Sequence, residues 1–199
     1  MNPTLNYYKQ NAQSFFDNTF DKPMQDLYEH FLPHLPKAGH ILDAGCGSGR
    51  DTKAFLELGF HVSAFDASKE MVALATSFAG RPIIHSDFKH FKSDDTFDGI
   101  WAAASLLHLP YQELVTTINT LSQQLKKGGY FYASFKYGET SYTKEGRHFT
   151  PLSPTLTRTL FSEISVLTLE EVWLSDDVRQ ERKGEKWLNL LAKKGETNA

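Results

Sequence analysis

Cysteine is nearly absent from this sequence. Its 199 residues include one, Cys46, so no disulfide can form within the chain and no set of thiolates can hold zinc. Long apolar runs are absent as well, because no stretch approaches the roughly 18 residues that a membrane-spanning helix requires. Residues 1–20 are polar and aromatic and lack the apolar segment of a signal peptide. We therefore expect a cytoplasmic protein with neither a membrane partner nor a bound metal.

Runs of basic residues are absent too. The chain carries 21 Lys and Arg against 24 Asp and Glu, a formal net charge of -3, and no block of consecutive cations could follow a phosphate backbone. Nucleic acid is therefore not an expected partner. With 40% hydrophobic and 23% charged residues, the composition is that of an ordinary globular domain. We expect a small-molecule ligand and a monomer or homodimer.

Strand-like and helical segments alternate along the chain, after two short helices predicted between about residues 7 and 32. A further helix is predicted from Ser153-Pro154, and segments 164–173 and 186–192 are predicted strands that could pair as a closing hairpin. Each crossover between strands is long enough for a helix, so the predicted fold class is α/β, with a mainly parallel sheet and helices on both faces. The other predicted strands are 40–44, 60–65, 82–85, 97–102 and 130–135, and a helix that includes residues 114–125 is expected to end near Gly128-Gly129.

Glycine recurs at alternate positions directly after the first predicted strand, in Asp43-Ala44-Gly45-Cys46-Gly47-Ser48-Gly49. Such a loop lets the backbone approach a ligand where a side chain would clash. Arg50 stands where the dinucleotide fingerprint has a small residue, and the Asp43 carboxylate would repel a pyrophosphate but attract an ammonium group. The pattern favours a ligand with a cationic end, and a simple tight connection is the alternative.

Acidic residues also follow the next two predicted strands. Asp66 lies 21 positions after Gly45 (66 minus 45), where a carboxylate can accept both hydroxyls of a ribose. Asp87 could accept a hydrogen bond from an adenine amino group, with Phe88 beside the ring. The alternatives are a helix cap for Asp66 and a turn for Asp87. Because the carboxyl ends of parallel strands share one edge, three acidic strand ends predict a nucleoside site there.

From about residue 40 to residue 135 the chain resembles the class I S-adenosylmethionine-dependent methyltransferases, among bacterial small-molecule enzymes of the ubiquinone-biosynthesis and tellurite-resistance types. The block from Asp43 to Arg50 is the most specific part of this resemblance. It implies a Rossmann-like, seven-stranded sheet with the last strand antiparallel, and S-adenosyl-L-methionine as the cofactor. The implied cofactor site comprises Asp43, Ala44, Gly45, Cys46, Gly47, Gly49, Asp66, Ala67, Met71, Asp87, Phe88 and Ala103.

Candidate residues for catalysis and for acceptor binding lie outside the glycine loop. His108 follows the fourth predicted strand, where relatives often carry a histidine; it could be a general base, or a histidine used only in packing. Segment 139–150 is expected to be a polar loop over the acceptor. In it, Tyr142 and Arg147 are candidates to contact the acceptor. Arg147 could pair with an acidic acceptor or brace the loop, and a solvated loop without a role is the alternative. Tyr8 is a third candidate for acceptor contact; it belongs to a helical lid or to the core.

Together these features predict transfer of a methyl group to an unidentified small molecule by direct in-line displacement. A binding module without catalysis is the alternative, and an NAD(P)-dependent oxidoreductase is a weaker one because of Arg50 and Asp43. A single domain, 1–199, is expected, divided into a helical lid (1–36), a cofactor-binding core (37–135), and an acceptor loop with the closing hairpin (136–199).

Overall fold

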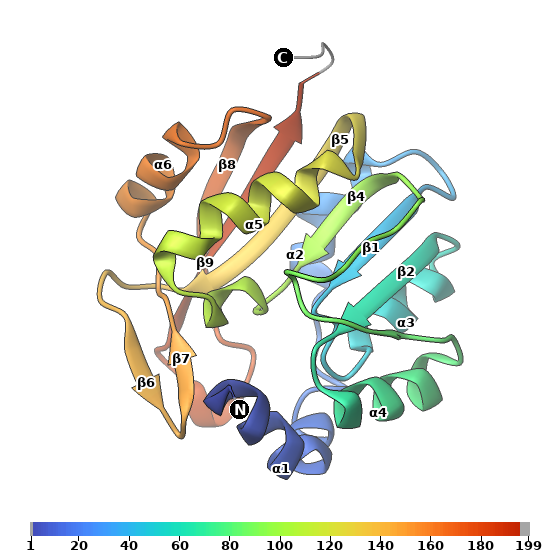
Figure 1. Ribbon diagram of the computed structural model, residues 1–199, viewed down its shortest axis with the longest axis vertical. Coiled ribbons are helices and arrows are strands. Elements are labelled where there is room, and N and C mark those ends of the chain that lie inside the picture. Colours follow the sequence, from blue (N-terminus) through green and yellow to red (C-terminus); the bar gives the residue numbers. More distant parts are fainter. Residues whose placement is uncertain (1, 196–199) are drawn as a thin grey trace.

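A seven-stranded sheet forms the centre of the computed structural model, which describes residues 2–195 (Figure 1). The strand order is β3-β2-β1-β4-β5-β9-β8; the first four pairings are parallel, and β9 runs antiparallel to both of its neighbours. This confirms the predicted fold class. Residue 1 and residues 196–199 of the predicted domain lie outside the described residues. The strands are β1 (His40–Ala44), β2 (His61–Asp66), β3 (Ile84–His85), β4 (Phe97–Ala102), β5 (Leu125–Lys136), β8 (Leu167–Asp176) and β9 (Lys186–Lys194).

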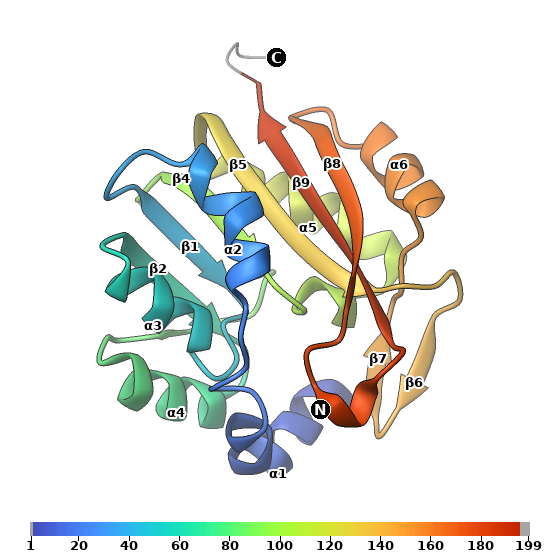
Figure 2. The same cartoon turned by 180° about the vertical axis from the view of Figure 1, so that it is seen from behind.

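Helices lie on both faces of this sheet, α5 and α6 on one and α2 and α3 on the other (Figure 2). Side chains begin three of the helices: Asn2, Ser68 and Ser153 each accept a hydrogen bond from a backbone N–H of the first turn. The helices are α1 (Pro3–Asp17), α2 (Gln25–Phe31), α3 (Arg50–Glu57), α4 (Lys69–Ala79), α5 (Tyr111–Gln123) and α6 (Pro154–Ser162), with short 3-10 helices η1 (Leu32–His34), η2 (Leu106–His108) and η3 (Gln180–Arg182).

The core on the α2 and α3 face is strongly aromatic. Trp101 of β4 and Tyr132 of β5 are fully buried and stack with ring centroids 3.9 Å apart, and Phe31 of α2 packs 5.2 Å from Trp101. Burying each such side chain contributes about 1.5–3 kcal/mol. The Tyr132 hydroxyl donates to Asn189 Oδ1 of β9. The core therefore fixes the central strands, whose carboxyl ends carry the candidate site.

Two predicted boundaries are wrong around Gly128-Gly129. The helix expected to end there ends at Gln123, and the strand expected to start at residue 130 already starts at Leu125. Gly128 has φ +73°, and a Cβ at Gly129 would come within 2.9 Å of the Asp98 carbonyl oxygen. The glycines thus allow an irregular strand start against β4 instead of ending a helix.

The expected polar loop at 139–150 is also not a plain loop. It contains a hairpin of β6 (Tyr142–Lys144) and β7 (Arg147–Phe149), joined by two residues with positive φ, Glu145 (+53°) and Gly146 (+76°). Two consecutive positive φ values suit the tight turn of a two-residue hairpin. Strands of three residues carry too short an alternation to be recognised from sequence.

The carboxyl ends of β1, β2 and β4 point to one edge of the molecule, and α1 lies across that edge (Figures 1 and 2). The β6–β7 hairpin and η3 lie at the same end. Within residues 2–195, no helix combines the length and the apolar character needed to cross a bilayer. The edge covered by α1 is where a parallel α/β sheet places its ligand.

Candidate active site

A cavity of about 780 Å³ lies under α1 at this edge of the sheet. Its wall includes most of the residues that the sequence singled out. Ala44, Gly49 and Tyr142 are not part of the wall. The predicted residues that do line it are Tyr8, Asp43, Gly45, Cys46, Gly47, Asp66, Ala67, Met71, Asp87, Phe88, Ala103, His108 and Arg147.

The three glycines of the loop after β1 have positive φ, between +54° and +78°, but they serve different contacts. A Cβ at Gly45 would lie 2.6 Å from the Cβ of Ser105, and one at Gly49 would lie 3.0 Å from the Cβ of Ala75. These two positions are therefore closed by packing. A Cβ at Gly47 would meet only the Phe15 ring, at 3.5 Å, so this backbone faces the cavity under α1.

Asp66 is the last residue of β2, and its carboxylate forms hydrogen bonds with both the glycine loop and the start of α4. Its Oδ2 accepts from the Gly47 N–H at 2.9 Å, and its Oδ1 accepts from the Ser68 N–H at 2.9 Å. Burial raises the pKa of this carboxyl, although the two N–H groups act in the opposite direction. A carboxylate has about four lone-pair positions, so two remain for a ligand in the cavity.

Asp43 is a buried carboxyl group with little compensation. It is the penultimate residue of β1, is 2% exposed, and accepts one hydrogen bond, from the Thr52 hydroxyl at 2.6 Å. Burial and the neighbouring Asp51 raise the pKa of Asp43 well above its usual range. A cation placed beside Asp43 in the cavity would reverse that effect.

Asp51, at the start of α3, was not singled out by the sequence and is the centre of a buried network behind the glycine loop. Its carboxylate accepts two hydrogen bonds from Arg50, at 2.7 and 3.0 Å. It also accepts from the Tyr28 hydroxyl at 2.6 Å and from Trp101 Nε1 at 2.8 Å. Burial alone would raise the pKa of Asp51, but Arg50 and the other donors hold it below its usual value. Asp51 is therefore the ionised neighbour of Asp43.

Asp87 lies two residues beyond β3, not at the end of the strand as predicted. Its Oδ1 accepts from both the backbone N–H of His90, at 2.8 Å, and His90 Nδ1, at 2.7 Å. The side chain is 45% exposed and lies on the cavity wall. The next residue, Phe88, packs edge-on against Phe65. Asp87 is thus a turn aspartate whose second oxygen stays open to the cavity.

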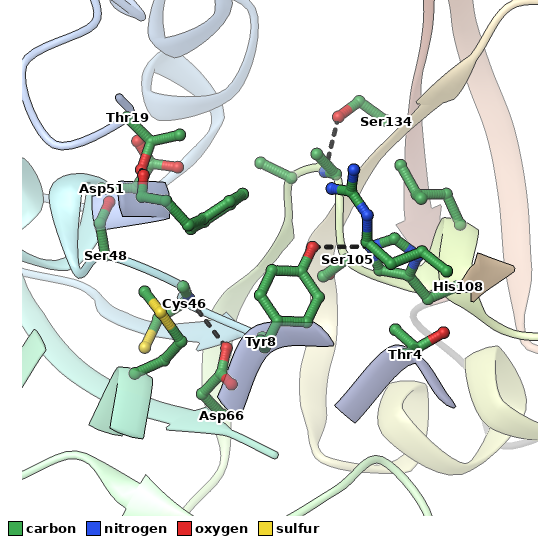
Figure 3. A pocket seen from close by; sticks show the side chains of 18 of the residues that line it. Thr4, Tyr8, Thr19, Cys46, Ser48, Asp51, Asp66, Ser105, His108 and Ser134 are labelled. Atoms are coloured by element: carbon green, nitrogen blue, oxygen red, sulfur yellow. Dashed lines mark hydrogen bonds between the residues drawn. The ribbon is translucent and has the colours of Figure 1, made fainter. Parts of the chain in front are cut away.

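Tyr8 and His108 meet across the cavity, between the glycine loop and the β6–β7 hairpin (Figure 3). His108 Nδ1 lies 2.8 Å from the His148 carbonyl oxygen, which can only accept, so Nδ1 carries the proton. His108 Nε2 then accepts from the Tyr8 hydroxyl at 2.9 Å. Burial lowers the pKa of His108 to about 4 and raises the pKa of Tyr8 to about 12. Both groups are therefore neutral near pH 7.

Arg147, the first residue of β7, is buried on the cavity wall. Its guanidinium carbon lies 3.8 Å from the ring centroid of Tyr7, and its Nη2 donates to Glu145 Oε2 at 2.5 Å. These contacts hold the hairpin against α1, which is one of the two roles that the sequence offered for Arg147. Tyr142 is 41% exposed and stacks on Phe149, whose ring does reach the cavity.

A cluster of charges that the sequence did not single out closes the cavity beside η3. Lys136 Nζ, at the end of β5, donates to Asp177 Oδ2 at 3.1 Å and to Glu185 Oε2 at 2.5 Å. Asp177 also accepts three hydrogen bonds from Arg179, two from the guanidinium and one from the backbone N–H, and one from Trp187 Nε1. These donors, with Arg179 foremost, keep the pKa of Asp177 well below its usual value despite burial. The only sequence signal for the cluster is the density of charge in 176–186.

Comparison with known sequences finds similarity to methyltransferases. Residues 41–129 match a family described as a methyltransferase domain. Over 151 residues the chain is 30% identical to an uncharacterized methyltransferase of Bacillus cytotoxicus, covering 70% of this chain and 71% of that protein. A ubiquinone biosynthesis O-methyltransferase of Xanthomonas campestris is 29% identical over 107 residues, covering 50% of this chain and 44% of that enzyme.

The fold is also similar to solved structures. One is the 1,6-didemethyltoxoflavin-N1-methyltransferase of Burkholderia thailandensis, which was determined with 1,6-didemethyltoxoflavin and S-adenosylhomocysteine bound. It superposes with a TM-score of 0.79 and 21% identity, covering 97% of this chain and 88% of that one. At this identity the likeness concerns the fold.

Proposed function

This chain belongs to the class I S-adenosylmethionine-dependent methyltransferase family, and on that premise we propose that it transfers a methyl group from S-adenosyl-L-methionine to a small-molecule acceptor. One observation supports this most strongly: the open backbone at Gly47, the uncompensated carboxyl of Asp43 and the Tyr8–His108 pair share one cavity. The cavity volume lies within the range of about 300–1,000 Å³ that is usual for small-ligand sites.

The cofactor cradle, as we call the wall formed by residues 43–48 and Asp66, fits a cationic nucleoside amino acid. Asp43 would attract the ammonium group, the backbone of Gly45, Cys46 and Gly47 would lie along the methionine portion, and the free lone pairs of Asp66 would accept the ribose hydroxyls. Ala44 and Gly49 would shape the loop from behind. At the adenine end we place Ala67, Met71, Asp87 and Phe88, and under the methionine portion Ala103.

When bound, the cofactor supplies an electrophilic methyl carbon on a sulfonium centre for in-line attack. The chain's own work is alignment and exclusion of water, and alignment of two reactants can lower a barrier by about 7–11 kcal/mol. Here α1 covers the cradle and brings Tyr8 to the acceptor side of Asp66. No strong acid or base is needed for such a step.

In this proposal His108 is a positioning residue. Its Nε2 accepts a hydrogen bond from the Tyr8 hydroxyl and its low pKa keeps the imidazole neutral, so it is not a free base in this arrangement. The hydrogen bond fixes the Tyr8 oxygen, with which the side chain of Arg147 also interacts. A remaining lone pair of this oxygen would accept an N–H or O–H of the acceptor and so orient its nucleophilic atom.

Calorimetric titration tests the proposal. We expect micromolar binding of S-adenosylmethionine and none of NADH, and at least about ten-fold weaker binding, or 1.4 kcal/mol, in Asp66→Asn. Asp94→Asn, an exposed carboxylate near the opposite edge of the sheet, is the matched control and should bind as the wild type does. Binding of NADH, or full affinity in Asp66→Asn, would overturn the proposed site.

An activity assay separates an enzyme from a binding module. The protein is incubated with S-adenosylmethionine and a panel of acids, amines, thiols and quinol precursors, and the formation of S-adenosylhomocysteine is measured. An enzyme forms it with at least one of these acceptors, whereas a binding module forms none.

A further inference from the structure

Arg147 carries a donor that the protein leaves unused. Its side chain is 8% exposed, and its Nε is fully covered without a hydrogen-bond partner. Two other side-chain atoms among the described residues share this condition, Ser122 Oγ and Gln124 Oε1, and neither residue lines the cavity. An unpaired donor on a buried cation is costly, so its presence on a ligand cavity indicates a partner that arrives with the ligand.

The plane of the Arg147 guanidinium is held by aromatic rings. Its central carbon lies 3.8 Å from the Tyr7 ring centroid and 5.3 Å from that of Phe149. Stacking of this kind occupies the face of the group and leaves its N–H edges for hydrogen bonds in the plane. Carboxylates match such an edge because they accept two parallel N–H bonds.

The present ion-pair partner of Arg147 is held weakly. Glu145 is in the turn of the β6–β7 hairpin, and its side chain is 56% exposed. Its bond to Arg147 Nη2 leaves Nε unpaired. Only the Glu145 side of this pair is exposed, so Glu145 regains its hydration when it leaves, and another carboxylate that pairs with the buried guanidinium can replace it at small cost.

Two other cations on this side of the cavity share a buried partner, whereas a third, Arg182, is itself 30% exposed and lies 3.9 Å from Glu185. Lys136 and Arg179 both bind Asp177, whose side chain is 1% exposed, and Arg179 does so through two hydrogen bonds. Arg147 differs because its one carboxylate is solvated. It also lies close enough to Tyr8, the proposed contact of the acceptor, for its charge to affect the pKa of that hydroxyl.

We infer that the methyl acceptor is a carboxylic acid whose carboxylate replaces Glu145 and binds the buried guanidinium of Arg147 through Nε and Nη2. This inference rests on the proposed methyl-transfer function and names its substrate class. Arg147 would hold the acid on the far side of Tyr8 from the cradle, so that the nucleophilic atom faces the methyl group. The β6–β7 hairpin thus carries both groups: Arg147, the cation that determines specificity, and Glu145, the carboxylate of the turn that pairs with Arg147 when no acceptor is bound.

The test uses protein saturated with S-adenosylhomocysteine and a library of small carboxylic acids, each paired with its primary amide and its phosphonate. Melting temperature reports binding. We expect the stabilising compounds to be acids, with little effect from the paired amides. Arg147→Gln and Arg147→Lys should each weaken the binding of those acids at least ten-fold, because glutamine lacks the charge and lysine lacks the planar fork.

Glu145→Gln keeps the fold and removes only the competing carboxylate, so it should tighten acid binding about three-fold. Glu139→Gln, another exposed glutamate nearby in sequence, is its control and should have no effect. Acids and amides that bind equally, phosphonates that bind better than acids, or acid binding unchanged in both Arg147 variants would overturn the inference. Affinity for S-adenosylhomocysteine is measured on the same proteins; its absence in the wild type would instead refute the proposed function.

Discussion

The two halves of the cavity are built in different ways. The cofactor cradle comes from one short stretch, residues 43–66, in which a strand, a glycine loop, a helix and a second strand follow one another. The acceptor half combines α1, η2, the β6–β7 hairpin and the β8–β9 connection, which are far apart in the sequence. The cradle is closed by backbone and tight packing, whereas the acceptor half is held by side-chain hydrogen bonds and ion pairs. Cofactor binding and acceptor binding should therefore respond to different mutations.

The largest loss of stability that would distinguish the two halves is expected from a substitution in the acceptor half. Lys136→Met leaves the buried Asp177 with Arg179 and Trp187 but without its ammonium partner, and it should lower the free energy of unfolding by about 3–5 kcal/mol. Urea unfolding measures this. Titration of S-adenosylhomocysteine at low temperature, where the variant stays folded, should give the wild-type affinity. Loss of that affinity would show that the two halves are not separable.

A pair of glycine variants probes the cradle itself. Gly45→Ala combines positive φ with a 2.6 Å approach to Ser105 and should cost about 2–5 kcal/mol of stability. Gly47→Ala has positive φ but only an ordinary contact with Phe15, so it should cost about 1–2 kcal/mol. Urea unfolding gives both values, and calorimetry should show that Gly47→Ala nevertheless loses affinity for the cofactor. Equal stability costs would contradict the packing assigned to Gly45.

The sequence was enough to predict which residues of the cradle lie together at the cavity wall. The pattern from Asp43 to Gly49 and the position of Asp66 predicted the cradle because consecutive residues of a strand-loop-helix unit have one geometry. They could not distinguish Gly45 and Gly49, which face packed side chains, from Gly47, which faces the cavity. That difference depends on Ser105, Ala75 and Phe15, which come from other elements.

The acceptor half could be predicted only as a list of candidate residues. Tyr8 and His108 are 100 positions apart, and no spacing rule brings them together. Lys136 and Asp177 are 41 positions apart, and their pairing depends on the register of β5, β9 and β8. Glu145 and Arg147 are close in sequence, but the turn that joins their side chains lies in a hairpin too short to recognise.

A smaller effect concerns the pH dependence of stability. The folded-state pKa of Asp43 is raised, so between the usual carboxyl range and that raised value the folded state binds more protons than the unfolded state, and stability falls as pH rises. Asparagine cannot ionise, so Asp43→Asn removes this fall in stability with rising pH. At pH 8 we expect the variant to be at least about 1.4 kcal/mol more stable than the wild type, the equivalent of one pKa unit, with a smaller advantage at pH 5. Thermal unfolding at both pH values measures it, and a pH-independent difference would argue against a raised pKa.

The smallest expected effect tests Tyr8. Tyr8→Phe keeps the ring contacts with Phe15 and His108 but removes the hydroxyl, so stability should fall by about 0.5–1.5 kcal/mol. Affinity for the cofactor should stay near that of the wild type, while kcat with any accepted substrate should fall about ten-fold, since orientation of the nucleophile is lost. The control is Tyr137→Phe, an exposed tyrosine outside the cavity. Unchanged kcat in Tyr8→Phe would limit Tyr8 to a packing role.

Proton release on cofactor binding tests most directly the claim that the cradle is a negative site prepared for a cation. S-adenosylmethionine is titrated by calorimetry at pH 7 in buffers of small and large ionisation enthalpy. Because the ammonium group lowers the raised pKa of Asp43, binding should release a fraction of a proton, so the heats should differ between buffers and the difference should vanish in Asp43→Asn. Equal heats in all buffers, together with wild-type affinity in Asp43→Asn, would contradict it.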